Sequence, residues 1–250
     1  MPELYIIAGC NGAGKTTASF TLLPEILGCK EFVNADIIAA EMCPLNPESV
    51  ALPAGRQMLH RIRELMLEKT DFAFETTLAT RSYVSLIEKA KETGYTVTLL
   101  FFWLNSPEMA EKRVLKRVEE GGHDMPAEVI KRRYHRGISN LMNLYIPICD
   151  NWLMIDNTST APLEISSGTN IAAESFGIWD IFPLHCGREE PEIAGQYEFK
   201  VRSGKIMEGL NTAMCNLVEM SARHNRELII SDKKGSIQSI PARDILFTVR

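Results

Sequence analysis

The chain has 250 residues, a net charge of −5 and a hydrophobic fraction of 45%, which suits one α/β domain with or without a small appendage. The acidic balance argues against a general nucleic-acid binder, and no apolar run is long enough to span a bilayer. Six scattered cysteines without a C-x-x-C pair, and a start at Met1–Glu3 without a secretory signal, predict reduced thiols and a cytoplasmic location.

The first motif follows a short apolar run, Leu4–Ala8, that predicts a buried parallel strand. Residues 9–16 match the phosphate-binding P-loop pattern G-x-x-x-x-G-K-[ST], and a helix is expected over Lys15–Leu23. In such a loop the backbone amides surround a polyphosphate, Lys15 reaches the β- and γ-phosphates, and the Thr16 hydroxyl faces magnesium. A chance match in a glycine-rich turn is the alternative, and the strand–loop–helix order disfavours it. ATP and Mg²⁺ are thus the expected cofactors, and the predicted contacts are Gly9, Cys10, Asn11, Gly12, Ala13, Gly14, Lys15, Thr16 and Thr17.

Strand-like and helical segments alternate over the first 155 residues. Further strands are expected at Phe32–Asn34, Phe72–Glu75, Thr96–Trp103 and Trp152–Ile155. Helices are expected around Glu48–Lys69, bent or divided at Pro53, and at Arg81–Thr93, Glu108–Glu120 and Ala127–Tyr145. This order predicts an α/β fold, a P-loop kinase-like parallel sheet flanked by helices, whose ligand lies beyond the carboxyl ends of the strands.

Polar residues follow the second and third expected strands. Asp36 is a candidate catalytic base that would accept the proton of an attacking hydroxyl, or it is the N-cap of the next helix, and one residue can do both. Glu75, Thr76 and Thr77 stand at a strand tip, where they can bind the hydroxyls of a polar substrate, and Glu75 can reach magnesium through water. Arg81 can clamp a substrate phosphate; an exposed loop is the alternative.

Basic residues concentrate in two helices joined by a hinge-like connection, Gly121–Pro126. Arg113 and Arg117 share one helix face by their i,i+4 spacing, as do Arg132 and Arg136. This arrangement is typical of a kinase lid that closes over ATP, while a solvated charged helix face is the alternative.

Several of these segments together resemble the zeta-toxin family of P-loop kinases, in its shorter form. The resemblance covers about the first 160 residues and implies ATP-dependent phosphorylation of a sugar hydroxyl on UDP-N-acetylglucosamine. It also implies that Asp36 is the catalytic base, that Lys15 contacts the nucleotide, and that Arg117 with Arg132 or Arg133 stabilises the transferring phosphoryl. The matching segments are residues 2–9 with the P-loop, Phe32–Asp36, Phe72–Leu78, Phe102–Leu104, residues 121–123 and the segment Arg132–Asn157. In P-loop kinases the loop after the last strand often lies against adenine, which makes Asn157 a candidate contact, although a simple turn explains it equally well.

The last ninety residues divide into two parts. Residues 161–203, including Phe176–Trp179, predict irregular packing and a linker behind a kinase domain of residues 1–160. Residues 204–250 predict a small α+β appendage, a helix followed by a hairpin that turns at Asp232–Gly235. This appendage resembles small antitoxin-like companions of short zeta-type toxins. It is either a fused inhibitory or regulatory module or a structural extension that completes the kinase.

Two classes of function therefore stay open. The first is a magnesium- and ATP-dependent kinase that acts on a sugar nucleotide, with an antitoxin-like partner or its fused equivalent. The second is an ATP-binding sensing protein that signals through its C-terminal part without transferring phosphate. A polynucleotide 5′-kinase is disfavoured by the net charge and by the shortage of exposed stacking aromatics, so neither nucleic acid nor membrane is an expected partner.

Overall fold

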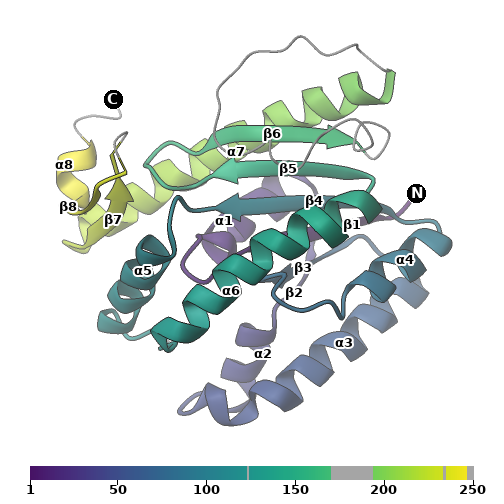
Figure 1. Ribbon diagram of the computed structural model, residues 1–250, viewed down its shortest axis with the longest axis horizontal. Helices are drawn as coiled ribbons and strands as arrows, with labels where there is room; N and C mark the ends of the chain where they lie inside the picture. Colours follow the sequence, from purple (N-terminus) through teal and green to yellow (C-terminus); the bar gives the residue numbers. More distant parts are fainter. Residues whose placement is uncertain (123, 170–193, 233–234, 247–250) are drawn as a thin grey trace.

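A computed structural model describes residues 1–122, 124–169, 194–232 and 235–246 (Figure 1). Its centre is a six-stranded sheet in the order β2-β3-β1-β4-β5-β6. The first five strands are parallel and β6 is antiparallel to β5. After β1 the chain forms β2 and β3 on one side of this strand, and it then forms β4 and β5 on the other side. The ligand site of such a sheet is expected where the strand order reverses, at the carboxyl end of β1. The strands are β1 (Glu3–Gly9), β2 (Glu31–Val33), β3 (Phe72–Thr76), β4 (Thr96–Trp103), β5 (Asn151–Asp156) and β6 (Leu163–Thr169).

Helices cover both faces of this sheet because successive strand residues point to opposite sides and both sides are apolar. Ile6 packs with α3, α4 and the segment after α6, whereas the next residue, Ile7, packs with α1, α5 and α7. Both side chains are fully buried. The expected parallel sheet flanked by helices is confirmed. The helices are α1 (Lys15–Thr21), α2 (Ala35–Met42), α3 (Ala51–Glu68), α4 (Val84–Glu92), α5 (Pro107–Glu119), α6 (Ala127–Asn140) and α7 (Ala194–Arg223), with short π-helical segments at Leu22–Ile26 and Leu141–Tyr145 and short 3-10 segments at Pro47–Val50 and Ile146–Ile148.

Local sequence signals explain several of these boundaries. The Ser106 hydroxyl accepts a hydrogen bond from the Met109 amide at 3.2 Å, and Pro107 is the first residue of α5. The hydroxyl satisfies one of the unpaired amides at the helix start, and proline has no amide to leave unpaired there. The bounds of β4 agree with the expected strand, whose central six residues are all buried.

The second helical stretch differs from the expectation in one respect. A bend or a division was expected at Pro53, but Pro53 lies in the first turn of α3, where its missing amide breaks no hydrogen bond. The change of helix type occurs earlier, where a 3-10 helix, Pro47–Val50, leads directly into α3.

The expected irregular segment 161–203 contains regular structure at both ends. Strand β6 adds an antiparallel edge to the sheet, and α7 begins at Ala194, so the expected boundary at 203/204 falls inside a helix. Phe176–Trp179 lie outside the described residues. We call the described part of residues 204–250 the C-terminal module.

The C-terminal module has the expected helix and hairpin, followed by one more helix. After α7 come β7 (Glu227–Ser231), β8 (Ile237–Pro241) and α8 (Ala242–Leu246), and the two strands pair antiparallel. In Figure 1, α7 runs along the sheet and the hairpin sits at its far end, beside α5. In the part of the chain that the structure describes, no helix combines the length and the hydropathy that a membrane crossing requires.

Candidate active site

The P-loop leaves the carboxyl end of β1 and leads into α1, as its motif predicts. Gly12 and Gly14 have φ angles of +78° and +84°, a region that side chains with a Cβ rarely adopt. A Cβ on Gly12 would lie 2.8 Å from the Ala110 carbonyl oxygen and 3.1 Å from the Arg113 Cβ. The glycine therefore allows α5 to pack directly on the phosphate loop.

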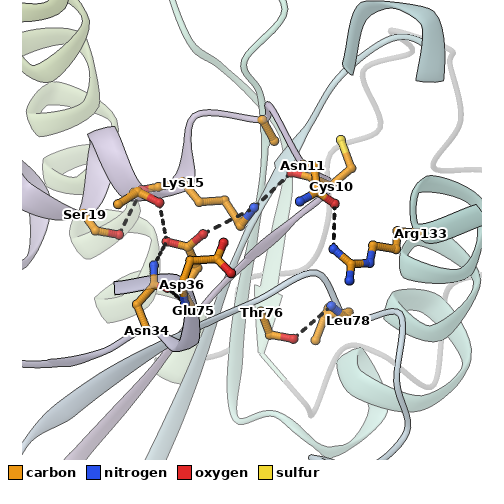
Figure 2. A network of polar contacts seen from close by, with 12 residues as sticks. Cys10, Asn11, Lys15, Ser19, Asn34, Asp36, Glu75, Thr76, Leu78 and Arg133 are labelled. Atoms are coloured by element: carbon orange, nitrogen blue, oxygen red, sulfur yellow. Dashed lines mark hydrogen bonds and ion pairs between the residues drawn. The ribbon is translucent and has the colours of Figure 1, made fainter. Parts of the chain in front are cut away.

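One carboxylate, that of Glu75, joins the P-loop to the neighbouring strands (Figure 2). Its Oε2 accepts hydrogen bonds from the Thr16 hydroxyl at 2.7 Å and from the Asn34 amide at 2.8 Å. Its Oε1 lies 3.4 Å from the Lys15 ammonium, which also donates to the Cys10 carbonyl at 2.9 Å. Lys15 is only 6% exposed. The parallel order β2-β3-β1 brings these groups together, because all three strands end at the same edge.

Asp36 does not cap α2. The Asn34 side chain accepts hydrogen bonds from the amides of Asp36 at 2.8 Å and Ile37 at 3.4 Å, so Asn34 is the N-cap. The capping alternative for Asp36 is thus wrong, since a residue with an extended backbone directly before the helix already performs that task. The Asp36 carboxylate lines the same cavity as Lys15 and Glu75, and Figure 2 shows the three side chains on neighbouring elements.

The structure distinguishes between the two candidate arginines of α6. Arg133 donates to the Asn11 side chain of the P-loop at 3.3 Å, whereas Arg132 is exposed. Burial lowers the pKa of Arg133, and the carboxylate of Asp36 partly offsets this effect. Arg117, on α5, lines the cavity. The guanidinium groups of Arg117 and Arg133 therefore lie on elements that pack against the phosphate loop.

Only one of the four expected substrate residues, Glu75, lines the cavity. The Thr76 hydroxyl accepts from the Leu78 amide at 3.1 Å and stabilises a turn in which Leu78 has a φ of +54°. The Thr77 carbonyl lies against α6, and Arg81 is exposed. Thr76 and Thr77 thus shape the turn after β3.

Arg113, which the sequence placed on the lid face with Arg117, is a half-buried residue that connects distant segments. Its guanidinium donates to the Ile229 carbonyl at 3.0 Å, to the Thr158 carbonyl at 3.3 Å and, at the limit of hydrogen bonding, to the Gly12 carbonyl at 3.5 Å. Burial lowers the pKa of Arg113 to about 10, so the group is still protonated at neutral pH. Sequence reasoning missed this role because the acceptors are backbone carbonyls from distant segments.

The cavity has a volume of about 310 Å³ and lies between the P-loop, α5, the loop after β5, and the C-terminal module. Asn157 lines it and donates to the Ala13 carbonyl at 2.8 Å, so this residue supports the P-loop backbone. Cys10 is buried, and burial raises the pKa of its thiol to about 11. Its side chain is therefore an uncharged filler behind the loop. The lining residues that carry charge are Lys15, Asp36, Glu75, Arg113, Lys116, Arg117, Glu120, Arg226 and Glu227.

Sequence comparison matches parts of the chain to known proteins. A model of a domain of unknown function (DUF8506) matches residues 196–249, which include the whole C-terminal module. An uncharacterized protein of Haemophilus influenzae is 29% identical over 126 residues, which cover 50% of this chain and 88% of that protein.

Two solved structures share the fold at low sequence identity. One comes from the PezAT chromosomal toxin–antitoxin system of Streptococcus pneumoniae, with a TM-score of 0.55 and 18% identity over 84% of this chain and 88% of that one. The other is the AvrRxo1-ORF1:AvrRxo1-ORF2 complex with ATP, with a TM-score of 0.53 and 18% identity over 86% of this chain and 76% of that one. The resemblance that the sequence indicated is confirmed at the level of the fold, and a P-loop in this setting implies nucleotide binding. The model of the AAA domain matches residues 4–136, more than half of the chain, and the protein belongs to that family.

Proposed function

We propose that this protein is an ATP- and magnesium-dependent kinase that phosphorylates a hydroxyl of a small molecule. The observation that carries the proposal is the shared cavity of Lys15, Thr16 and Asp36. A phosphate-binding lysine and a carboxylate at the same edge of the sheet are the two groups that a phosphoryl transfer to a hydroxyl needs.

Each residue has a chemical task in this proposal. The acceptor hydroxyl attacks the γ-phosphorus of ATP, a new oxygen–phosphorus bond forms, and the bond to the β,γ-bridging oxygen breaks, so that ADP leaves. Asp36 takes the proton of the hydroxyl. Lys15, Arg133 and Arg117 supply positive charge to the phosphoryl oxygens, where charge is concentrated during transfer.

Magnesium fits the residues present. The Thr16 hydroxyl and the Glu75 carboxylate lie 2.7 Å apart and offer the oxygen ligands that this ion prefers. Among the described residues no group of three His, Cys, Asp or Glu side chains could hold a metal by itself. This agrees with Mg²⁺ sites that rely on substrate phosphates and water for most ligands. When bound, the ion neutralises charge on the β- and γ-phosphates.

The acceptor that we propose is a sugar nucleotide similar to UDP-N-acetylglucosamine, on the basis of the resemblance to zeta-toxin kinases. Glu75, which lines the cavity together with Asp36, is the candidate contact for such an acceptor. A protein from a toxin–antitoxin system shares the fold, which supports a toxin-type role with an antitoxin-like partner or with the C-terminal module as its fused equivalent.

The test compares two neutralising substitutions on α2. Asp36→Asn removes the proposed base, whereas Glu41→Gln makes the same kind of change at an exposed position of the same helix. Purified proteins are incubated with Mg-ATP and a panel of nucleotide sugars, and products are identified by mass. We expect a product heavier by one phosphate with the wild type and with Glu41→Gln, and a loss of at least about 100-fold in turnover with Asp36→Asn.

Binding of ATP to each protein is measured in parallel by calorimetry. Normal ATP affinity together with lost turnover in Asp36→Asn supports the role of Asp36 as base, and retained turnover contradicts it. A wild-type protein that binds ATP but yields no product with any acceptor supports the second candidate, an ATP-binding sensor. Arg113 lines the cavity beside the P-loop and donates to the Ile229 carbonyl of β7, and this link is the observation that favours the alternative.

A further inference from the structure

The C-terminal module contributes one wall of the nucleotide cavity. Five residues of α7 line it with the spacing i, i+3, i+4, i+7 and i+11, so they form one stripe along the helix: Leu210, Ala213, Met214, Leu217 and Ser221. The strand β7 adds Leu228, Ile229 and Ile230. This wall is mainly apolar, in contrast to the charged end of the cavity at the P-loop.

The stripe changes its environment along the helix. Ile206 and Leu210 are buried in the core beneath the sheet, with exposed fractions of 0% and 2%. One and two turns later, Met214 and Leu217 are only partly buried, and they face the cavity. The same apolar face therefore packs on the sheet at one end and continues past it over the cavity.

Hydrogen bonds hold the hairpin at the rim of this cavity. The Ser231 amide donates to the Thr158 carbonyl at 3.1 Å, and the Asn105 amide group donates to the Ser231 hydroxyl at 2.9 Å. Arg113 adds its bond to the Ile229 carbonyl. With these bonds formed, a cavity of about 310 Å³ is still present between the module and the P-loop. The module thus encloses space and does not fill it.

We propose that this space binds the base and ribose of the nucleotide, so that the C-terminal module is a component of the nucleotide site. The inference rests on the proposed function, because it takes the P-loop as the phosphate site. The flat face of a base suits the apolar side chains of Met214 and Leu217, and Pro162 lines the same cavity from the loop after β5. The volume is within the range of small-molecule sites, which are mostly apolar with a few polar groups.

The test uses two identical substitutions on one helix. Met214→Ala shortens a side chain that lines the cavity, whereas Met220→Ala shortens one that is 58% exposed and is not among the lining residues that the structure describes. Binding of ATP and of inorganic tripolyphosphate is measured for both variants and for the wild type by calorimetry. We expect Met214→Ala to weaken ATP binding about ten-fold, with tripolyphosphate binding unchanged, and Met220→Ala to affect neither.

The outcomes separate this inference from the proposed function. Equal ATP affinity in Met214→Ala and the wild type overturns the inference while the phosphate site stands. Tighter ATP binding in Met214→Ala also overturns it and supports an inhibitory module. Failure of the wild type to bind either ligand contradicts the proposed function itself. Circular dichroism and melting temperature confirm that each variant is folded, and Leu217→Ala provides a second lining variant with the same expected result.

Discussion

The contact between Arg113 and β7 allows a direct test of how the C-terminal module is attached. Arg113→Met keeps the length and the apolar stem of the side chain but removes the guanidinium that bonds the carbonyls of Ile229 at 3.0 Å and Thr158 at 3.3 Å. The third contact, to Gly12 at 3.5 Å, is too long to contribute much. Two partly buried carbonyls therefore lose a charged donor.

The expected magnitude follows from these two bonds. A hydrogen bond to a charged group contributes about 1.5–3 kcal/mol, so two give roughly 3–6 kcal/mol. Methionine has no charge and therefore no desolvation penalty at this half-buried position. The expected loss in the free energy of unfolding is therefore at the lower end of this range, about 3 kcal/mol. For a chain of this length a loss of 1 kcal/mol lowers the melting temperature by about 2–4 °C, so the expected decrease is about 6–12 °C.

The assay is thermal unfolding of the variant beside a control from the same helix, together with hydrogen exchange of β7. Lys112→Met removes one positive charge at an exposed position next to Arg113, and its stability should stay within about 0.5 kcal/mol of the wild type. In Arg113→Met the amides of β7 should exchange faster. A melting temperature within about 2 °C of the wild type, or unchanged exchange in β7, would refute the reasoning.

Three further predictions concern the phosphate loop. Burial raises the pKa of the Cys10 thiol from 9.0 to about 11, so this thiol ionises at lower pH in the unfolded chain than in the folded protein. The contribution of the neutral thiol to the free energy of unfolding is therefore complete below pH 9 and is lost as the pH rises toward 11. At pH 10 this loss is about 1.4 kcal/mol. The free energy of unfolding, measured from denaturation curves, should therefore decrease more between pH 8 and pH 10 for the wild type than for Cys10→Ala. Gly12→Ala combines an unfavourable φ with a Cβ 2.8 Å from the Ala110 carbonyl oxygen. The control, Gly28→Ala, has a similar φ of +63°, but its Cβ would have no atom within 4 Å. Calorimetry should show ATP binding weakened by about ten-fold or more in Gly12→Ala only. Glu75→Gln removes a negative charge beside Lys15 and should tighten ATP binding without metal by roughly five-fold. The gain should disappear with Mg²⁺ if Glu75 helps to hold the ion, and an equal gain with and without Mg²⁺ would argue against that role.

Features encoded by local sequence could be predicted. The P-loop motif, the start of α5 at Ser106 and the extent of β4 depend on residues that are neighbours in the chain. Strand β6 was missed because it is an edge strand with small polar residues and little burial, so neither alternation nor an apolar run marks it. Helix α2 is short and begins after Asn34, which caps it. The sequence offered Asp36 as an alternative N-cap, two residues too late.

The site could be predicted only in part for a related reason. Helical spacing places Arg132 and Arg133 on different faces of α6, but only the packing of that helix decides which face meets Asn11. Arg113 and Arg117 look equivalent in the sequence, and their difference depends on the position of β7. The motif locates the phosphate end of the cavity, whereas the other wall depends on tertiary contacts of the C-terminal module.

The long separation between Arg113 and its acceptor has a consequence for protein synthesis. Ile229 follows Arg113 by 116 residues. At a translation rate of about 5–20 residues per second, roughly 6–23 s pass between the synthesis of the two. During this interval the growing chain already contains its phosphate loop, while the segment that closes the other side of the cleft has not yet been made. A ribosome-bound chain should therefore acquire its full affinity for nucleotide late, after β7 has emerged and docked.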